Sequence, residues 1–226
     1  VLEVVTPRFI KSVQLAILAL GATILIGIPL GVLSAVKKDT YIDRITSAAA
    51  YFGVSLPEFV TGTLLILLLG GPIFAIFPSS GYVSPTEGIG NWAMHMILPV
   101  ATLTILLLAH IMRQTRSELI EVLQSEYVRS ARLKGLTERT VLVKHALRNG
   151  LLPTITVLAL NFGWLLGSLA VVEEIFAYPG LGRLAVFAIQ NRDIPLLQLI
   201  VIIIAVSFTI ANFGADLPYG YPAPAL

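Results

Sequence analysis

The sequence contains no cysteine and few charged residues, and both shortages narrow the class of protein it can belong to. Without cysteine, disulfides and thiolate metal sites are excluded, and the three histidines are too scattered to form a metal-binding motif. Asp, Glu, Lys and Arg make up 12% of the 226 residues, against about 25% in soluble domains. Hydrophobic residues account for 56%, and the mean hydropathy is +0.88. This is the composition of an integral membrane protein.

Five long stretches of the chain carry no charged residue at all. Each exceeds the roughly 20 residues that a helix needs to cross the hydrocarbon core, and none alternates as barrel strands do. We therefore expect an all-α integral membrane protein, a single transmembrane domain over 1–226. The five expected helices cover about 12–36, 45–77, 93–112, 151–172 and 196–215. Pro57 is expected to kink the second helix or to separate an interfacial segment from it.

The basic residues indicate how the chain is oriented in the membrane. Three lie in the turn 37–44 and eight in the loop 113–148, out of fifteen in all. If the helices alternate in direction, these two loops share a side, and the positive-inside rule makes that side cytoplasmic. The loops 78–92 and 173–195 are then external. Val1 is also placed outside, next to Arg8 and Lys11, so we expect a sixth helix to precede this sequence in the full-length protein.

The loop 113–150 is expected to form a helix, a sharp turn and a second helix. An apolar face recurs at three- and four-residue intervals up to Lys134. Gly135 can adopt the left-handed conformation that ends a helix, and Thr137 can cap the next one, over 138–147. One interpretation is an amphipathic hairpin that lies on anionic lipid. The other, which we favour, is a docking surface for a protein, because Ser130 and Ala131 are poor lipid anchors and allow close approach.

The same segment resembles the coupling segment, often called the EAA loop, of permease subunits of ABC importers. Within that group it is similar to the dipeptide, oligopeptide and nickel importer family, in which YVR-x-AR-x-KGL is followed by HALRN-x-x-(I/L)P. Here these motifs occupy 127–136 and 145–153. The similarity extends to LAILALGATILIGIPLGVLSA at 15–35, EEIFAYPGLGRL at 173–184 and NRDIPLLQ at 191–198. The chain departs from the family in lacking the N-terminal helix and in its tail, where Pro218, Pro222 and Pro224 replace an apolar stretch that ends in arginine.

The resemblance implies a function and a set of partners. The chain would be a non-catalytic permease subunit of the bacterial inner membrane, forming half of a pathway for dipeptides, oligopeptides or a related solute such as a nickel complex. A second homologous permease, two cytoplasmic ATPase subunits, an external solute-binding protein and the lipid bilayer would be its partners, with no role for nucleic acid. ATP and Mg would bind to the ATPase subunits, and this chain would hold no cofactor, in keeping with the lack of a Walker-type phosphate loop in it.

The resemblance also implies which residues meet the ATPase. The expected coupling residues are Glu126, Tyr127, Arg129, Ser130, Ala131, Arg132, Lys134, Gly135 and Leu136. Tyr127, Ala131 and Leu133 are expected to supply packing in a cleft of the ATPase, and the basic residues to supply charge. Movement of this segment is expected to tilt the fourth transmembrane helix, which follows directly after Pro153.

Residues along the transport pathway are less sharply indicated by the sequence. Asn161 and Ser168 are seven residues apart, on one face of the fourth helix, where they can line the pathway or bond to neighbouring helices. The external mouth is expected to involve Glu173, Glu174, Tyr178 and Pro179. The alternative function is a gradient-driven secondary transporter or channel. It would need an inverted repeat and paired ionisable residues at mid-membrane, and the sequence shows neither.

Overall fold

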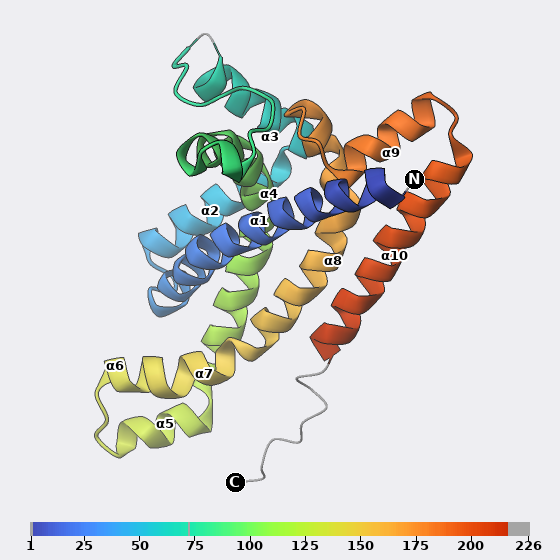
Figure 1. Ribbon diagram of the computed structural model, residues 1–226. Coiled ribbons are helices and arrows are strands. Elements are labelled where there is room, and N and C mark those ends of the chain that lie inside the picture. Colours follow the sequence, from blue (N-terminus) through green and yellow to red (C-terminus); the bar gives the residue numbers. More distant parts are fainter. Residues whose placement is uncertain (1, 72, 217–226) are drawn as a thin grey trace.

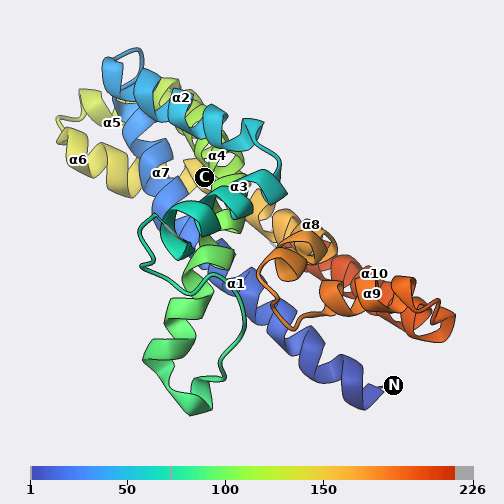
Figure 2. The same ribbon diagram turned by 90° about the horizontal axis from the view of Figure 1, so that it is seen from above.

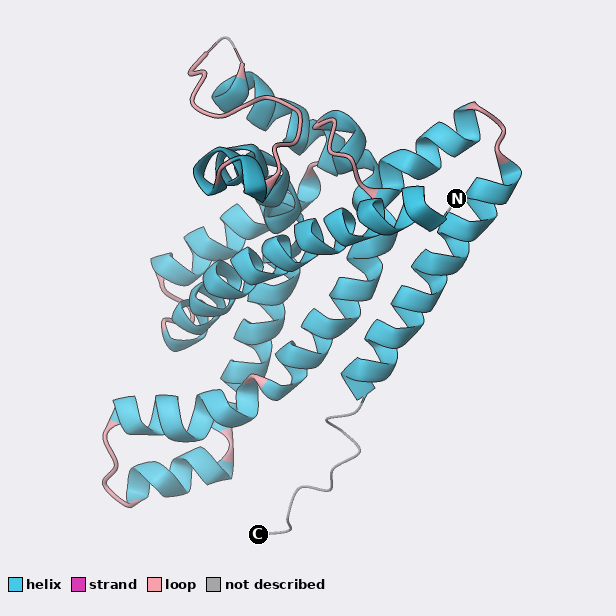
Figure 3. Cartoon of the chain, viewed as in Figure 1, coloured by secondary structure: helices cyan, strands magenta, loops and turns pink. Residues whose placement is uncertain are grey.

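The computed structural model describes residues 2–71 and 73–216, and in this part all regular structure is helical (Figure 3). The α-helices are α1 (Leu2–Val36), α2 (Tyr41–Ser55), α3 (Glu58–Leu65), α4 (Ile89–Gln124), α5 (Glu126–Leu133), α6 (Glu138–Thr140), α7 (Leu147–Gly150), α8 (Leu152–Ile175), α9 (Leu181–Gln190) and α10 (Ile194–Asp216). Two π-helical segments, η1 (Ile66–Gly70) and η3 (Val141–Ala146), and the 3₁₀ turn η2 (Pro85–Glu87) complete the set. The Pro-rich tail, singled out above as a departure from the family, lies outside the described residues.

Candidate membrane spans account for most of the described residues. α1, α4, α8 and α10 are each long and apolar enough to cross a membrane, and α2 with α3 and η1 makes a fifth candidate if this pair, which is bent by 101°, is counted as one span. The bend lies at Pro57, because proline has no backbone N–H and cannot donate the hydrogen bond that would continue the helix. The all-α prediction is confirmed, and the helix is interrupted at Pro57 as predicted, although the second predicted helix ends at Gly70 and not near Phe77.

Two helices are longer than expected, because charge alone does not end a helix. α1 begins at Leu2 and not near Ser12, and Lys11 within it lies over the ring of Tyr82, with 4.3 Å between Nζ and the ring centroid. α4 continues to Gln124, so the first third of the expected loop 113–150 belongs to a long helix. The expected break at Gly135 is preceded by another at Ser125.

Ser125 starts a new helix because its side chain caps it. The Ser125 hydroxyl accepts a hydrogen bond from the backbone N–H of Val128 at 3.4 Å and donates one to the carbonyl of Val122 at 2.7 Å. Further on, Gly135 has φ of +77° and Thr137 accepts from the N–H of Thr140, as predicted. Residues 126–150, from α5 to α7, therefore form a separate helical hairpin, which we call the hairpin.

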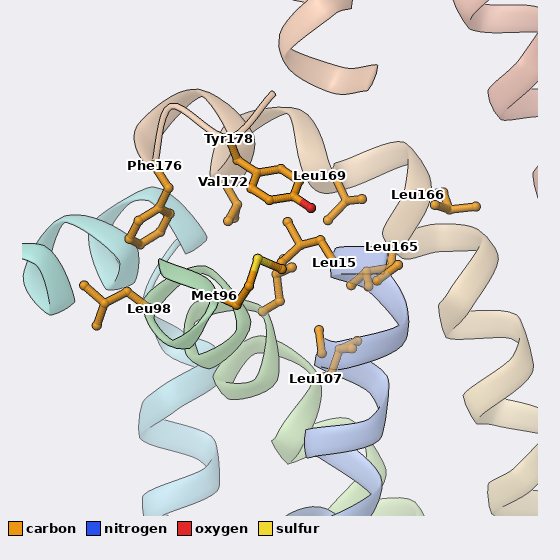
Figure 4. Packing of buried hydrophobic residues seen from close by; sticks show 13 residues of the cluster. Leu15, Met96, Leu98, Leu107, Leu165, Leu166, Leu169, Val172, Phe176 and Tyr178 are labelled. Atoms are coloured by element: carbon orange, nitrogen blue, oxygen red, sulfur yellow. The ribbon is translucent and has the colours of Figure 1, made fainter. Parts of the chain in front are cut away.

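The core of the membrane part lies between α1, α4 and α8. Leucines from the three helices interlock there, among them Leu15, Leu107 and Leu169, and Phe176 and Tyr178 close one end (Figure 4). α1 and α4 come very close at Gly31, where an added Cβ would lie 2.7 Å from the Cβ of Thr115. Each helix thus buries one apolar stripe and leaves the other for lipid or a partner subunit.

The loops lie at two opposite ends of the bundle. Figure 1 shows the hairpin projecting from the ends of α4 and α8, while the loop before α4 and the turn between α8 and α9 lie at the opposite end. In the view from above, α10 and α9 lie beside α8, away from α2 and the hairpin (Figure 2). This is the distribution expected if the loops 78–92 and 173–195 face one side of the membrane and the hairpin faces the other.

Candidate functional site

The hairpin has a small apolar core of its own, which fixes it to the membrane helices. Val128 and Ala131 of α5 pack against Val141 and Ala146 of the returning limb. Leu119 of α4 and Ala35 of α1 belong to the same cluster. Ala131, which is predicted from the sequence to pack into a partner, is only 6% exposed, and its side chain lies in the hairpin's own core.

Polar contacts hold the two limbs of the hairpin together across the Gly135 turn. The Arg132 guanidinium donates two hydrogen bonds to the Glu138 carboxylate, with Nε to Oε1 at 2.9 Å and Nη2 to Oε2 at 3.2 Å. Tyr127 Oη lies 2.6 Å from His145 Nδ1, and the two rings meet edge to face. Arg132 and Tyr127 thus brace the hairpin, while both remain partly open to solvent.

The outer face of α5 and the turn presents both charge and apolar surface. Leu133 is 82% exposed, the highest value among the large exposed hydrophobic side chains of the described residues. The exposed residues of the outer face are Glu126, Arg129, Ser130, Leu133, Lys134, Gly135 and Leu136. Over 126–150 the hairpin has six basic and two acidic residues, a net charge of +4. Such a surface suits an acidic partner with an apolar recess.

The hairpin is joined to the membrane helices by very short connections. Ser125 alone separates α4 from α5, and Leu151 alone separates α7 from α8. Gly150 lies against α4, where an added Cβ would be 3.3 Å from Leu119 Cδ1. The hydroxyl oxygens of Thr115 on α4 and Thr154 on α8 are 3.5 Å apart. A displacement of the hairpin is therefore passed to α4 as well as to α8.

The two candidate pathway residues of α8 bond to their own helix. Asn161 Nδ2 donates to the carbonyl of Val157 at 2.7 Å, and the Ser168 hydroxyl donates to the carbonyl of Leu165 at 3.1 Å. Ser168 also lines an open groove of about 540 Å³ between α8 and α10. Asn161 does not line this groove.

Adjacent glutamates at the end of α8 have opposite environments. Glu173 is fully buried, and its carboxylate accepts hydrogen bonds from the Ser12 hydroxyl at 2.5 Å and the Arg183 N–H at 3.0 Å. Ser12 in turn accepts from the N–H of Leu181 at 2.7 Å. The two side chains together satisfy N–H groups at the start of α9 that have no partner within the helix. Glu174, in contrast, is half exposed, with Oε2 3.5 Å from Arg183 Nε.

The turn that follows Glu174, which is predicted from the sequence to contribute to the external mouth, is packed against α1 and the start of α9, and we call this contact the joint. Tyr178 is 1% exposed, and its hydroxyl donates to the carbonyl of Lys11 at 2.9 Å. Burial, with Tyr82 and Glu173 nearby, raises the pKa of Tyr178 further above its usual range, in which the hydroxyl is already a donor at neutral pH. Pro179 is partly buried. The sequence gives no sign that Ser12 belongs to this joint, since a serine near a helix start is common.

Comparison with known proteins identifies the family. The model of the family "Binding-protein-dependent transport system inner membrane component" matches residues 27–226. The chain belongs to this family. The dipeptide transport system permease protein DppB of Escherichia coli K12 is 38% identical over 247 residues, covering 99% of this chain and 73% of that protein. The glutathione transport system permease protein GsiC of Pectobacterium atrosepticum is 38% identical over 219 residues, covering 97% and 69%.

Further similarities agree with this assignment. The probable peptide ABC transporter permease protein y4tP of Sinorhizobium fredii is 35% identical over 223 residues, covering 97% of this chain and 70% of that protein. A structure of the MetNI methionine ABC transporter in an inward-facing conformation aligns with a TM-score of 0.72 at 15% identity, covering 95% of this chain and 94% of that one. An amino acid ABC transporter aligns with a TM-score of 0.71 at 18% identity, covering 95% and 92%. The solved structures establish the fold.

Membership of this family confirms several expectations drawn from the sequence about function, location and partners. The chain is a permease subunit of a binding-protein-dependent ABC importer, homologous to peptide transport permeases. It is a multi-pass, non-catalytic component of the inner membrane. Membership of the family implies an ATPase and a binding protein as partners. The resemblance drawn from the 127–136 and 145–153 motifs is thereby confirmed.

Proposed function

We propose that this permease forms half of a translocation pathway for peptides, the other half being a second, homologous permease. Two ATPase subunits bind ATP and Mg on the cytoplasmic side, and a binding protein delivers the solute outside. The relatives named for dipeptide, glutathione and peptide transport support a peptide cargo. A solute related in size, such as a nickel complex, would follow the same route.

The observation that carries this proposal is the hairpin, whose outer face docks with an ATPase subunit. Leu133 inserts into an apolar recess, and Arg129, Lys134 and Leu136 contact the rim. Glu126, Ser130 and Gly135 allow close approach around them, while Tyr127, Ala131 and Arg132 keep the hairpin in shape from within. Because the hairpin is braced on α1, α4 and α8, closure of the ATPase pair moves these helices as rigid bodies and opens the pathway to the other side.

The pathway residues follow from the same arrangement. Ser168 lines the groove between α8 and α10 and faces the solute or the partner permease, while Asn161 stabilises α8. Glu174 and Pro179 contribute to the external mouth. Glu173 and Tyr178 shape that mouth from inside the joint.

The proposal is tested by placing a negative charge on the outer face of the hairpin. In a reconstituted transporter, Leu133→Glu is expected to abolish co-purification of the ATPase subunits, or to leave ATP hydrolysis without uptake of a tritiated dipeptide such as dialanine. Leu133 is better suited than Ala131, because a change at Ala131 would disturb the hairpin core itself.

Ile89→Glu is the matched control, since Ile89 is 73% exposed and lies at the opposite end of α4. It should leave binding of the ATPase subunits unchanged. Normal ATPase binding and normal uptake by Leu133→Glu would exclude the hairpin as the docking surface.

The net charge of the hairpin leads to a second expected result. Raising the salt concentration from about 0.05 to 0.5 M shortens the Debye length several-fold and so weakens attraction between exposed charges. The affinity of the detergent-solubilised permease for its ATPase subunits should fall several-fold over this range, measured as a dissociation constant. Lys134→Glu should weaken binding further and flatten its dependence on salt.

Lys38→Glu is the control for this experiment, because Lys38 is basic and exposed but belongs to the turn before α2. It should bind as the unchanged protein does. An affinity that is independent of salt would show that charge on the hairpin plays no part in docking.

A further inference from the structure

Asp43 is a buried carboxylate to which four parts of the chain donate hydrogen bonds. Its side chain is 5% exposed, and the Arg116 guanidinium binds it twice, with Nε to Oδ1 and Nη2 to Oδ2 both at 2.7 Å. The Ser34 hydroxyl donates to Oδ1, the backbone N–H of Asp39 to Oδ2 at 3.0 Å, and the Ser47 hydroxyl lies 3.5 Å from Oδ1. We call Ser34, Asp43 and Arg116 the clasp.

The clasp joins three helices at the end of the bundle that carries the hairpin. Ser34 belongs to α1, Asp43 to α2 and Arg116 to α4. A planar guanidinium that binds both oxygens of a carboxylate fixes orientation as well as distance. Such a contact resists rotation of one helix against another in a way that apolar packing does not.

α2 depends on the clasp more than its neighbours do. Of its fifteen residues, only Asp43 and Ala50 are buried. Ala50 packs against Ala109 and Met112 of α4 together with the partly buried Val54, and an added Cβ at Gly53 would lie 3.1 Å from Ile105 Cγ2. α1 and α4, in contrast, interlock through the core described above. Asp43 therefore supplies the buried polar attachment of α2 to α1 and α4, beside this narrow apolar contact.

The clasp also lies next to the hairpin along α4. Arg116 is three residues before Leu119, which belongs to the apolar core of the hairpin with Val128 and Ala131. Both residues are on one unbroken helix, which continues to Gln124. A movement of the hairpin that shifts Leu119 therefore shifts Arg116 with it.

At its other end α2 is separated from the next part of its span by the 101° bend. Leu56 and Pro57 are both in extended conformations there, with ψ of 130° and 147°. No helical hydrogen bond can pass through Pro57, since it has no N–H. The bend is thus a point about which α2 can turn while α3 stays in place.

Building on the proposed function, we propose that Asp43 is a positioning residue that makes α2 move with α4 when the ATPase displaces the hairpin, with Leu56 and Pro57 as the hinge. The transmembrane response then involves α2 as well as α8. Without the clasp, α4 moves and α2 does not follow.

The absence of cysteine from the chain allows a direct measurement of these movements. Spin labels on cysteines at Ile45 and Glu121 report the separation of α2 and α4, and labels at Ile45 and Phe59 report the bend; all three positions are exposed. Pulsed electron paramagnetic resonance is recorded on the assembled transporter with cysteine-free partners, without nucleotide and with ATP plus vanadate. We expect an unchanged, narrow Ile45–Glu121 distribution and a shifted Ile45–Phe59 distribution.

Variants of the clasp show whether Asp43 causes this behaviour. Asp43→Asn keeps the shape but removes the charge, and Arg116→Lys keeps the charge but loses the two-point contact. Both should broaden the Ile45–Glu121 distribution in ATP plus vanadate and reduce dialanine uptake per ATP hydrolysed several-fold. Arg113→Gln, which changes an exposed arginine one turn earlier on α4, should do neither.

Three results would overturn the role of Asp43: a nucleotide-dependent change in the Ile45–Glu121 distance of the unchanged clasp, no change across the bend, or a narrow distribution that persists in both clasp variants. The first two do not depend on the stability of any variant. Each is separable from failure of the proposed function, which Leu133→Glu tests alone. If Leu133→Glu uncouples the transporter and the labels behave otherwise than expected, only the clasp mechanism is excluded.

Discussion

Glu173→Gln is expected to destabilise the permease by about 1.5–3 kcal/mol, the range for hydrogen bonds to charged groups, while Glu174→Gln changes stability little. The buried Glu173 carboxylate accepts from Ser12 and from the N–H of Arg183. A glutamine side chain has one acceptor oxygen in place of two. Its amide N–H₂ would therefore face either the Ser12 hydroxyl or the N–H of Arg183, both of which are donors.

The measurement is the thermal unfolding midpoint of the purified permease in detergent. For a chain of this size, the expected loss lowers the midpoint by about 5–10 °C. Glu174→Gln is the matched control, because the pair with Arg183 is open to solvent on both sides and such pairs contribute about 0–1 kcal/mol. Equal midpoints for the two variants would mean that Glu173 does not hold the joint.

Gly182→Ala is the second change for which we expect a large effect. A Cβ on Gly182 would lie 2.4 Å from the Cα and 2.7 Å from the N of Ala170. These are backbone atoms of α8 and cannot turn aside as a side chain would, so α9 must move away from α8. Overpacking of this kind costs about 1–3 kcal/mol, and backbone contact places this site at the upper end.

Unfolding of Gly182→Ala in detergent should therefore begin at a midpoint about 6–12 °C below that of the unchanged protein. Gly21→Ala is the control, since no atom lies within 4 Å of the position its Cβ would take. Its midpoint should be equal or slightly higher, because alanine favours a helix over glycine. A normal midpoint for Gly182→Ala would mean that α8 and α9 are not packed as closely as described.

The membrane fold is largely predictable from the sequence, because spans must be apolar and charges must avoid hydrocarbon. The uncharged stretches locate α1, α4, α8 and α10 and the α3–η1 part of the bent pair, and Pro57 marks the bend. They do not locate α2, which contains Asp43 and Arg44. The ends of α1 and α4 are not predictable in this way. Lys11 lies within α1 with its Nζ over the ring of Tyr82, a partner 71 positions away, and the end of α4 is set by the cap at Ser125 and not by the first charged residue.

The contacts of the candidate site are less predictable from the sequence than the membrane fold. Periodicity finds the apolar face of α5, but it does not say whether that face meets a partner or the rest of the chain. The side chain of Ala131 is buried in the hairpin and that of Leu133 is exposed to solvent, although both residues are apolar and only two positions apart. Glu173 and Glu174 form one acidic pair in the sequence, yet consecutive residues point about 100° apart on a helix. Asp43 and Arg116 meet across 73 positions, and no local pattern indicates such a pair.

The one-residue connections at Ser125 and Leu151 make the hairpin sensitive to chain length. The hairpin can pass a displacement to α4 and α8 only if the connections at Ser125 and Leu151 do not extend or bend. An added residue at either connection would let the hairpin follow the ATPase while the attached span stayed still, even with every contact residue unchanged. The spacing between the hairpin and its two spans is thus as much a part of the mechanism as the identity of the residues on its outer face.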